Sequence, residues 1–273
     1  MADDSITLTR DGHVATMTLN RPERKNALSY AMLDRMSDIV RELKADREIR
    51  VLLFTAAGDT FCAGTDLREL SSQTFDKKDG PASAQANRET RNSLRGAGLD
   101  APWLFHNLPQ PVITLLNGAA VGLGAELALA SDIRITSTKG RLNWVFAKRG
   151  LIPDTGAGTW LLPRLVGTSK ALEIMLTARM LDANELLRTG LVSEVVEPTE
   201  LLARGQKLAA EIASCSPMSI RIIKDLTYRG LFREPREHVQ ETAKLIGECF
   251  KSADFAEGVK SFLEKREPKF TGA

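Results

Sequence analysis

Two acidic residues lie in stretches that are otherwise apolar or glycine-rich: Glu126 in "LGAELALA" and Asp154 in "RGLIPDTGAG". Apolar surroundings raise the pKa of a carboxyl group, and such a group exchanges protons near neutral pH. The chain has no GxSxG and no HExxH motif, and its three histidines have no metal-ligand spacing: His13, His106 and His238. Any catalysis is therefore expected to depend on carboxylates and backbone groups, without a metal.

Each of these carboxylates also has an ordinary structural interpretation. Asp154 follows a proline, and Asp after Pro often begins a helix by accepting a backbone N–H in the first turn. Glu126 falls in a helix that is apolar nearly all round, as buried helices are. A buried carboxylate costs free energy unless it is paired or functional. The residue types alone leave both interpretations open.

Two glycine-containing turns are candidates to supply the backbone groups. "FCAGTDLREL" (61–70) follows the strand-like "VLLFTAA", and "NGAAVGLGAELALASD" (117–132) follows "PVITLL". A helix is expected to begin after each, and helix N-termini present unpaired N–H groups. Two such ends side by side would direct two N–H donors at one oxygen, as in an oxyanion hole. The alternative is an ordinary strand-to-helix connection, and "GLGAEL" lacks the third glycine of a dinucleotide-binding motif.

The elements that would position these turns follow an α/β pattern. "SITLTR" and "HVATMTLN" alternate around the Asp-Gly turn at 11–12 and predict a hairpin. "VLLFTAA", "PVITLLNG" and "DIRITST" predict buried strands, and the first two lead into glycine turns and helices, as in βα units. Residues 29–46 predict an amphipathic helix, whose apolar face is formed by Leu33, Met36, Val40 and Leu43.

Two further regions differ from this pattern. Residues 71–97 are polar and weakly periodic, and they predict a surface segment bordering a helix, either an exposed loop or a lid over a substrate tail. After Leu191 the pattern is mostly helical, and Pro217 suits a first helical turn. The last helices carry enough apolar surface to pack against the body or a neighbouring subunit, through Phe250, Phe255, Phe262 and Leu263.

Composition is that of an ordinary globular protein, with 43% hydrophobic and 26% charged residues among 273. Its 37 basic and 35 acidic side chains leave a net charge of +2, which gives no support to nucleic-acid or membrane-surface binding. "MADDSITLTR" shows no signal or transit pattern, and no segment approaches the ~18 apolar residues of a membrane span. Three cysteines without a CxxC pair predict free thiols in a reducing compartment, and we expect the cytoplasm.

Six segments together resemble the crotonase superfamily, the enoyl-CoA hydratase/isomerase family. They are "RPERKNALS", "FCAGTDL", "NGAAVGLGAELALASDIRI", "GLIPDTGAGTWLLPRLVG", "SKALEIMLTARMLDANELLRTGLVSEVV" and "FLEKREPKF", in the family's order. The resemblance implies an α/β fold with a crotonase-like ββα spiral core over residues 1–198. It also implies a C-terminal helical trimerisation region over residues 199–273, and thus a homotrimer or a dimer of trimers.

The resemblance implies an acyl-CoA thioester as substrate, and no separate cofactor because coenzyme A is part of that substrate. The thioester oxygen would accept hydrogen bonds from the backbone N–H groups of Thr65 and Leu123. An Arg24 and Lys25 pair suits coenzyme A phosphates, although a solvated surface pair is the alternative. The coenzyme A moiety would run past Arg24, Lys25, Ala27, Ala63, Gly64, Asp66 and Leu67.

The resemblance also assigns roles to the carboxylates. Family hydratases hold one water between two glutamates; Glu126 matches the first, and Phe146 occupies the second position, where we expect a pocket wall. Some members carry an aspartate at the position of Asp154. In dienoyl-CoA isomerases and a ring-epoxide isomerase it moves protons, whereas in an aryl-CoA dehalogenase it attacks the ring. "GLIPD.G" is most similar to the ring isomerases. The dehalogenase has a tryptophan at the Phe146 position, which disfavours dehalogenation here, and we expect Trp144 and Trp160 to be pocket wall or core.

These observations favour an isomerase that moves a double bond in an enoyl-CoA or ring-acyl-CoA ester, with Glu126 and Asp154 as its catalytic residues. Two alternatives stay open. A hydratase would hold water between the same two carboxylates and add it to a 2-enoyl-CoA. A non-catalytic binding protein would resemble the family member that binds RNA, which the near-neutral charge and the retained carboxylates disfavour.

Overall fold

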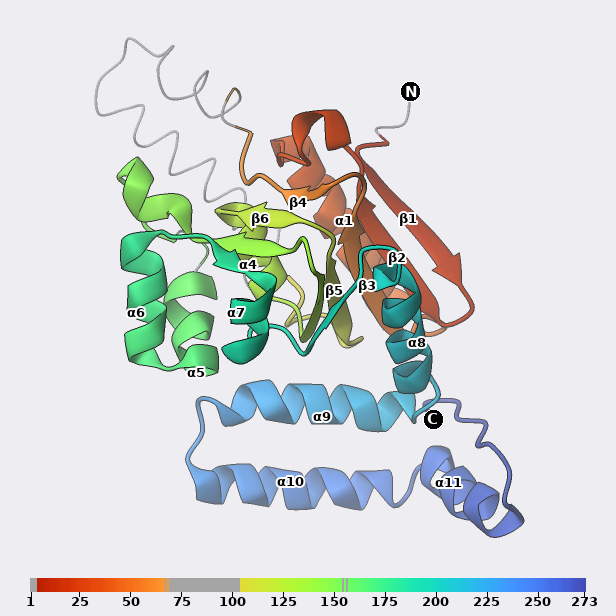
Figure 1. Ribbon diagram of the computed structural model, residues 1–273. Helices are drawn as coiled ribbons and strands as arrows, with labels where there is room; N and C mark the ends of the chain where they lie inside the picture. Colours follow the sequence, from red (N-terminus) through yellow and green to blue (C-terminus); the bar gives the residue numbers. More distant parts are fainter. Residues whose placement is uncertain (1–3, 67, 69–103, 154, 156) are drawn as a thin grey trace, which may run out of the picture.

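The first half of the chain builds most of one sheet. The structure, a computed structural model, describes residues 4–66, 68, 104–153, 155 and 157–273. Six strands lie in the order β1-β2-β3-β5-β7-β10 (Figure 1). β1 and β2 form the predicted antiparallel hairpin, and the other pairs are parallel. The bounds are β1 (Ile6–Asp11), β2 (Val14–Leu19), β3 (Val51–Ala56), β5 (Val112–Leu116), β7 (Ile133–Ser137) and β10 (Glu194–Val196).

A second sheet of four short strands has the order β4-β6-β8-β9. Its first three strands each follow a strand of the large sheet, because β3, β5 and β7 lead into β4, β6 and β8. The chain therefore winds through repeated strand–strand turns, which is the ββα spiral that the sequence predicts. The bounds are β4 (Thr60–Cys62), β6 (Ala119–Val121), β8 (Arg141–Asn143) and β9 (Leu181–Asp182).

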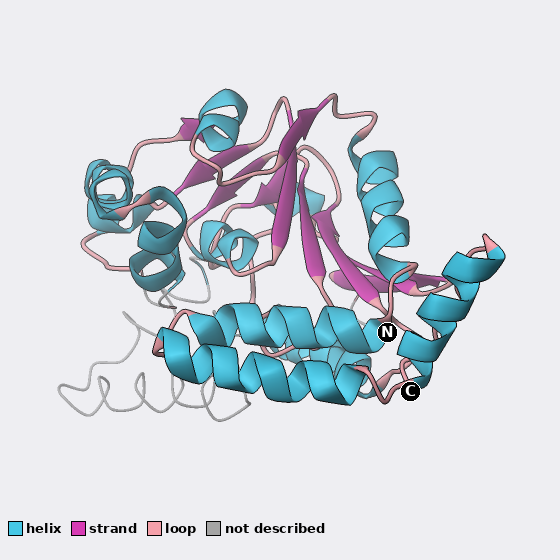
Figure 2. Cartoon of the chain, turned by 90° about the horizontal axis from the view of Figure 1, so that it is seen from below, coloured by secondary structure: helices cyan, strands magenta, loops and turns pink. Residues whose placement is uncertain are grey.

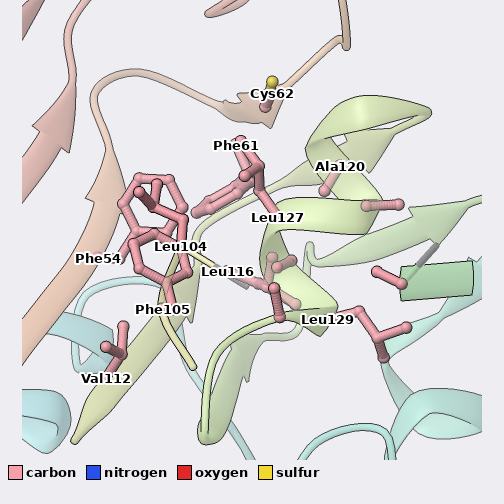
Figure 3. Packing of buried hydrophobic residues seen from close by; sticks show 14 of the residues in the cluster. Phe54, Phe61, Cys62, Leu104, Phe105, Val112, Leu116, Ala120, Leu127 and Leu129 are labelled. Atoms are coloured by element: carbon pink, nitrogen blue, oxygen red, sulfur yellow. The ribbon is translucent and has the colours of Figure 1, made fainter. Parts of the chain in front are cut away.

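The main core lies on one face of the large sheet. Two helices cover it, α1 (Tyr30–Ala45) and α4 (Leu123–Leu129). Helix α1 is the predicted amphipathic helix, and the Ser29 hydroxyl accepts the Met32 N–H at its start. Aromatic rings fill the centre, where Phe54 lies 5.2 Å from both Phe61 and Phe105, measured between ring centroids (Figure 3). Such pairs stabilise a core beyond the area they bury.

Helix α8 (Leu201–Ala213) covers the opposite face of the large sheet. The helix approaches closely at Gly205, where an added Cβ would lie 2.6 Å from the Leu115 methyl groups. A larger residue there would have to push the Leu115 side chain aside, so glycine lets the helix axis lie near the strands. The apolar cluster on this face comprises Val51, Leu53, Ile113, Leu115, Ile135, Leu201, Ala209 and Ala213.

Three C-terminal helices lie below the sheets: α9 (Pro217–Gly230), α10 (Pro235–Cys249) and α11 (Ala253–Glu264). Figure 2 shows α9 and α10 running side by side. Pro217 occupies the first turn of α9, as predicted. Within this single chain the predicted apolar side chains of the last helices stay largely exposed, including Phe262 at 82%. The remaining elements are η1 (Pro22–Arg24), η2 (Val145–Arg149), the π-helical η3 (Ala157–Leu161), α5 (Leu162–Val166), α6 (Thr168–Thr177) and α7 (Ala183–Arg188).

The hairpin, the amphipathic helix, the three buried strands and the C-terminal helices thus match the sequence predictions. The polar segment 71–97 lies outside the described residues. The division of the chain after residue 198 stays a prediction. Among the described residues no helix is both long and apolar enough to cross a membrane.

Candidate active site

The two glycine-containing turns lie side by side because the strands before them are neighbours. β4 and β6 pair in parallel, with Cys62 opposite Ala120, so the turns after their carboxyl ends meet at one edge. Gly64 has a φ of 99°, and an added Cβ would lie 2.9 Å from the Val121 carbonyl oxygen and 3.7 Å from the Leu123 nitrogen. Glycine is required here both by the backbone conformation and by the close approach.

Two backbone N–H groups are available at this junction. Thr65 forms a parallel bridge with Leu28, in which the Leu28 N–H donates to the Gly64 oxygen at 2.8 Å and the Asp66 N–H donates to the Leu28 oxygen at 2.9 Å. This pairing does not use the Thr65 N–H. Leu123 is the first residue of α4, where N–H groups have no intrahelical acceptor. Within the described ranges neither N–H has a protein acceptor, as a pair of oxyanion donors requires.

Glu126 lies one helical turn after Leu123 and is 1% exposed. Its Oε1 accepts the indole N–H of Trp144 at 2.7 Å, and its Oε2 accepts the hydroxyl proton of Thr155. Gly158 closes the pocket, because an added Cβ would lie 2.6 Å from Oε1 and 2.9 Å from the Trp144 ring. The carboxylate is therefore held in one orientation by three residues outside α4: Trp144, Thr155 and Gly158.

Trp144 and Thr155 have contacts that sequence reasoning missed. Trp144 is fully buried, in agreement with the expected core position, but its N–H also holds the candidate catalytic carboxylate. A buried indole N–H needs an acceptor, and this need was the available signal. Trp160 is half-buried and stacks on Phe232 with centroids 4.7 Å apart, while the Arg164 guanidinium lies 3.9 Å over its ring.

Phe146 lies beside the start of α4. Its side chain is almost fully buried, and the ring Cζ is 4.0 Å from where a Cβ on Gly122 would lie. Its position next to the second turn is compatible with the predicted pocket wall. A phenyl ring there offers no hydrogen-bonding group to a water molecule.

The segment expected to meet coenzyme A is organised by Asn26, a buried residue that was not singled out from the sequence. Its amide donates to the carbonyl oxygens of Ala57 at 2.9 Å and Thr60 at 2.7 Å, and its oxygen accepts the Arg21 N–H. Asn26 and Lys25 both have positive φ values, which make a tight turn. The turn places this segment against the end of β4.

The expected coenzyme A residues therefore fall on two adjacent segments, since the Ala63 N–H donates to the Lys25 oxygen at 3.0 Å. Arg24, Lys25 and Ala63 are exposed, and Asp66 lies 3.5 Å from the Arg21 guanidinium. Ala27 is half-buried beside them. Two predicted residues, Leu67 and Asp154, lie outside the described residues.

The surroundings of the Cys62 thiol, another potentially reactive group near the site, make it unsuitable as a nucleophile or base. Burial raises the pKa of the Cys62 thiol to about 12, so this neighbour of α4 stays protonated. The described residues contain no cluster of potential metal ligands. A cavity of about 690 Å³ lies elsewhere, between the β1–β2 hairpin, α8 and the C-terminal tail, and none of the predicted site residues lines it.

The two sheets, the paired turns and the buried glutamate define a crotonase-type α/β protein. A family model described as enoyl-CoA hydratase/isomerase matches residues 9–273, and the chain belongs to this family.

Three similar proteins illustrate the range of activities named in this family. The chain is 35% identical to 1,2-epoxyphenylacetyl-CoA isomerase of Escherichia coli, covering 95% of each chain. It is 36% identical to (E)-benzylidenesuccinyl-CoA hydratase of Thauera aromatica, covering 98% of this chain and 99% of the relative. The crystal structure of an enoyl-CoA hydratase from Bacillus anthracis superposes with a TM-score of 0.89 at 31% identity, covering 98% and 100%. These names support an enzyme rather than the non-catalytic alternative, and they include both an isomerase and hydratases.

Proposed function

We propose that this enzyme is an isomerase that moves a double bond in an enoyl-CoA or ring-acyl-CoA ester. The observation that carries the proposal is the buried Glu126 carboxylate, one helical turn from the Leu123 N–H, with Phe146 where a hydratase has its second glutamate. Thr65 and Leu123 donate their N–H groups to the thioester oxygen. Glu126 and Asp154 move the proton.

The reaction follows from where charge develops. When a proton leaves the α carbon of the ester, or the γ carbon of a 2-enoyl ester, negative charge moves onto the thioester oxygen. Two N–H donors stabilise the enolate that forms. A carboxylate takes the proton, and a carboxyl group returns one to the other carbon. The phenyl ring of Phe146 cannot orient an attacking water, so the enolate is reprotonated with no water added. The enzyme needs no cofactor, because coenzyme A is part of the substrate, and it works as a homotrimer or a dimer of trimers.

A hydratase is the second candidate, and the likeness to (E)-benzylidenesuccinyl-CoA hydratase favours it. In that case Glu126 and Asp154 jointly hold the water, and Asp154 replaces the glutamate that Phe146 displaces. The two candidates share the oxyanion hole and differ only in whether water is added.

Heavy water distinguishes the two reactions. The purified enzyme is incubated in D₂O with 2-enoyl-, 3-enoyl- and ring-bearing acyl-CoA esters, and products are followed by mass and ultraviolet absorbance. An isomerase incorporates deuterium and moves the double bond without adding water. A product heavier by one water, formed at a substantial rate from crotonyl-CoA, would replace the isomerase assignment with the hydratase.

The role of Asp154 is tested with Asp154→Asn. We expect turnover to fall by about 10²- to 10⁴-fold, the usual contribution of a positioned acid or base, while CoA-ester binding persists. Binding is measured by calorimetry with a non-reactive acyl-CoA. Asp11→Asn, an exposed carboxylate in the β1–β2 hairpin, makes the same chemical change away from the site. Unchanged turnover in Asp154→Asn would remove this residue from the mechanism.

A further inference from the structure

The hydrogen bonds around Glu126 favour its ionised form. An indole N–H is only a donor, so Oε1 must be the acceptor in its contact with Trp144 at 2.7 Å. The Thr155 hydroxyl accepts the Ala157 N–H at 3.3 Å, which leaves its proton for Oε2 of Glu126. Both oxygens of the glutamate therefore accept hydrogen bonds from neutral side chains. Hydrogen bonds of this kind favour the ionised carboxylate.

Burial acts in the opposite direction. Glu126 is 1% exposed, and desolvation favours the neutral carboxylic acid. Without the two donors, burial alone would favour the protonated acid, which cannot accept a proton from a substrate. The donors thus offset the burial that shields the reaction from water.

We infer that Trp144, assisted by Thr155, is a positioning residue that keeps Glu126 ionised and oriented, so that Glu126 is the group that accepts the proton from the substrate. In that step one C–H bond of the acyl-CoA breaks, an O–H bond forms on Glu126, and the electron pair passes into the enolate. Reprotonation at the other carbon completes the shift and restores the carboxylate. This inference rests on the proposed function, and it adds which of the two carboxyl groups takes the proton from the substrate.

The geometry around Trp144 supports a dedicated contact. The side chain is fully buried at the start of η2, and Gly158 packs so closely that an added Cβ would lie 2.9 Å from the ring and 2.6 Å from Oε1. Phenylalanine fills much of the same space without the N–H. Trp144→Phe therefore removes the hydrogen bond to Glu126 and keeps most of the packing.

Several charged and titratable groups lie on the described elements around Glu126. Cys62 on β4 is protonated. Arg134 on β7 donates to backbone carbonyls at the far end of α4, and Arg164 on α5 lies over Trp160. Lys148 and Arg149 on η2 point to solvent as exposed side chains. Asp154, the residue before Thr155, is the other carboxyl group of the proposed site, and every variant below retains it.

The first test measures Glu126 without substrate. Protein labelled with ¹³C at the glutamate side-chain carboxyl carbon is titrated by NMR, and Glu126→Gln assigns the signal. Trp144→Phe and Thr155→Val are each expected to raise the titration midpoint by about one pH unit, since each removes one hydrogen bond to the charged form. Thr155→Ser, which keeps the hydroxyl, is expected to restore the wild-type midpoint.

Trp160→Phe is the matched control, because Trp160 stacks on Phe232 rather than on Glu126. Its midpoint should equal that of the wild type, whatever its effect on stability. Unchanged midpoints in folded Trp144→Phe and Thr155→Val would overturn the inference. If Trp144→Phe does not fold, Thr155→Val and Thr155→Ser carry the test.

The second test uses the ester that is turned over in heavy water. The acid limb of kcat/KM should move to higher pH by the same interval as the NMR midpoint. At neutral pH kcat should fall with little change in KM, because Trp144 lies away from the coenzyme A segment. Shifted midpoints without any double-bond movement would refute the proposed reaction, and the positioning role of Trp144 and Thr155 at Glu126 would still stand. Double-bond movement with unshifted midpoints would refute the positioning role of Trp144 and Thr155, and the proposed reaction would still stand.

Discussion

Two carboxylates, one within a short helix and one just after it, have different partners. Glu126 lies within α4, and Asp132 lies three residues past its end. Glu126 is 1% exposed and is held by the neutral donors Trp144 and Thr155. The Asp132 side chain is 14% exposed and is held by a cation, with the Lys224 ammonium 2.7 Å from Oδ2.

The partners of Asp132 form a closed network. The Tyr228 hydroxyl donates to Oδ1 at 2.6 Å, and the Val112 N–H donates to Oδ2 at 2.6 Å. Lys224 also donates to the carbonyl oxygens of Phe105 and Gln110, so the ammonium has three acceptors. Because Lys224 and Tyr228 belong to α9, this network fastens the C-terminal helices to the sheet.

The difference is the one expected between a structural carboxylate and one that transfers protons. A carboxylate paired with a fixed cation is neutralised, and protonating it would leave a buried ammonium without its counter-charge. A carboxylate held by neutral donors accepts a proton without leaving an opposite charge behind. Burial alone therefore does not point to a catalytic residue, and the charge of the partners distinguishes these two carboxylates.

Glu126→Gln is expected to give the largest contrast between the loss of turnover and the loss of stability. We expect kcat to fall by up to about 10⁴-fold, which corresponds to about 5.5 kcal/mol of transition-state stabilisation. The free energy of unfolding should change by only about 1 kcal/mol, because the amide oxygen still accepts the Trp144 N–H and the Thr155 hydroxyl can rotate to accept the amide N–H. Turnover and urea denaturation of the same preparation measure both quantities. A large loss of stability with retained turnover would make Glu126 structural and end the comparison.

Lys224→Met is expected to give the opposite result. It removes the cation of the Asp132 carboxylate and the ammonium donor of the Phe105 and Gln110 carbonyl oxygens, at a cost of about 3–5 kcal/mol in the free energy of unfolding. Below the unfolding transition kcat/KM should stay within about twofold, since Lys224 contacts no residue of the proposed site.

Adding Asp132→Asn to Lys224→Met sharpens this test. The double variant removes the uncompensated charge and should recover part of the lost stability. A double variant no more stable than Lys224→Met alone would show that the charge pair is not what stabilises this junction.

Local sequence pattern was sufficient to predict the hairpin, the amphipathic helix over residues 29–46 and the buried strands, because hydrophobic period is a local property. It also predicted that the turns ending in Thr65 and Leu123 precede helices. Their adjacency depends on the pairing of β4 with β6, which no local pattern specifies.

The hydrogen-bond partners of both carboxylates could not be predicted from local sequence pattern for the same reason. Trp144 is 18 residues from Glu126, and Lys224 is 92 residues from Asp132. In the sequence Lys224 is one more lysine of an amphipathic helix, and Trp144 is one more buried aromatic residue. Only the tertiary fold brings each onto its carboxylate, while the catalytic roles of Glu126 and Asp154 stay predictions.

The smallest predicted effect concerns pH and the network around Asp132. The His106 ring lies 4.0 Å from the Tyr228 ring, and burial lowers the pKa of His106 to about 4, although Asp132 partly opposes this change and Lys224 adds to it. In the unfolded chain a histidine titrates near 6.5, so between pH 6.5 and 4 the unfolded state binds a proton that the native state does not. Stability is therefore fully present above pH 6.5 and decreases as the pH falls, by up to about 3 kcal/mol at pH 4.

His106→Phe keeps an aromatic ring against Tyr228 and has no proton to bind, so its unfolding free energy should lose this part of the acid decline. Urea denaturation of both proteins at pH 7.5, 6 and 5 measures the difference in slope. Equal slopes would mean that His106 takes up its proton at the same pH in the native and unfolded states, and below that pH the network at Asp132 would hold a second cation beside Lys224. Different slopes, with the acid limb of kcat/KM unchanged in His106→Phe, would show that His106 beside the Asp132 network and Glu126 in α4 titrate independently, so that the first affects stability and the second affects turnover.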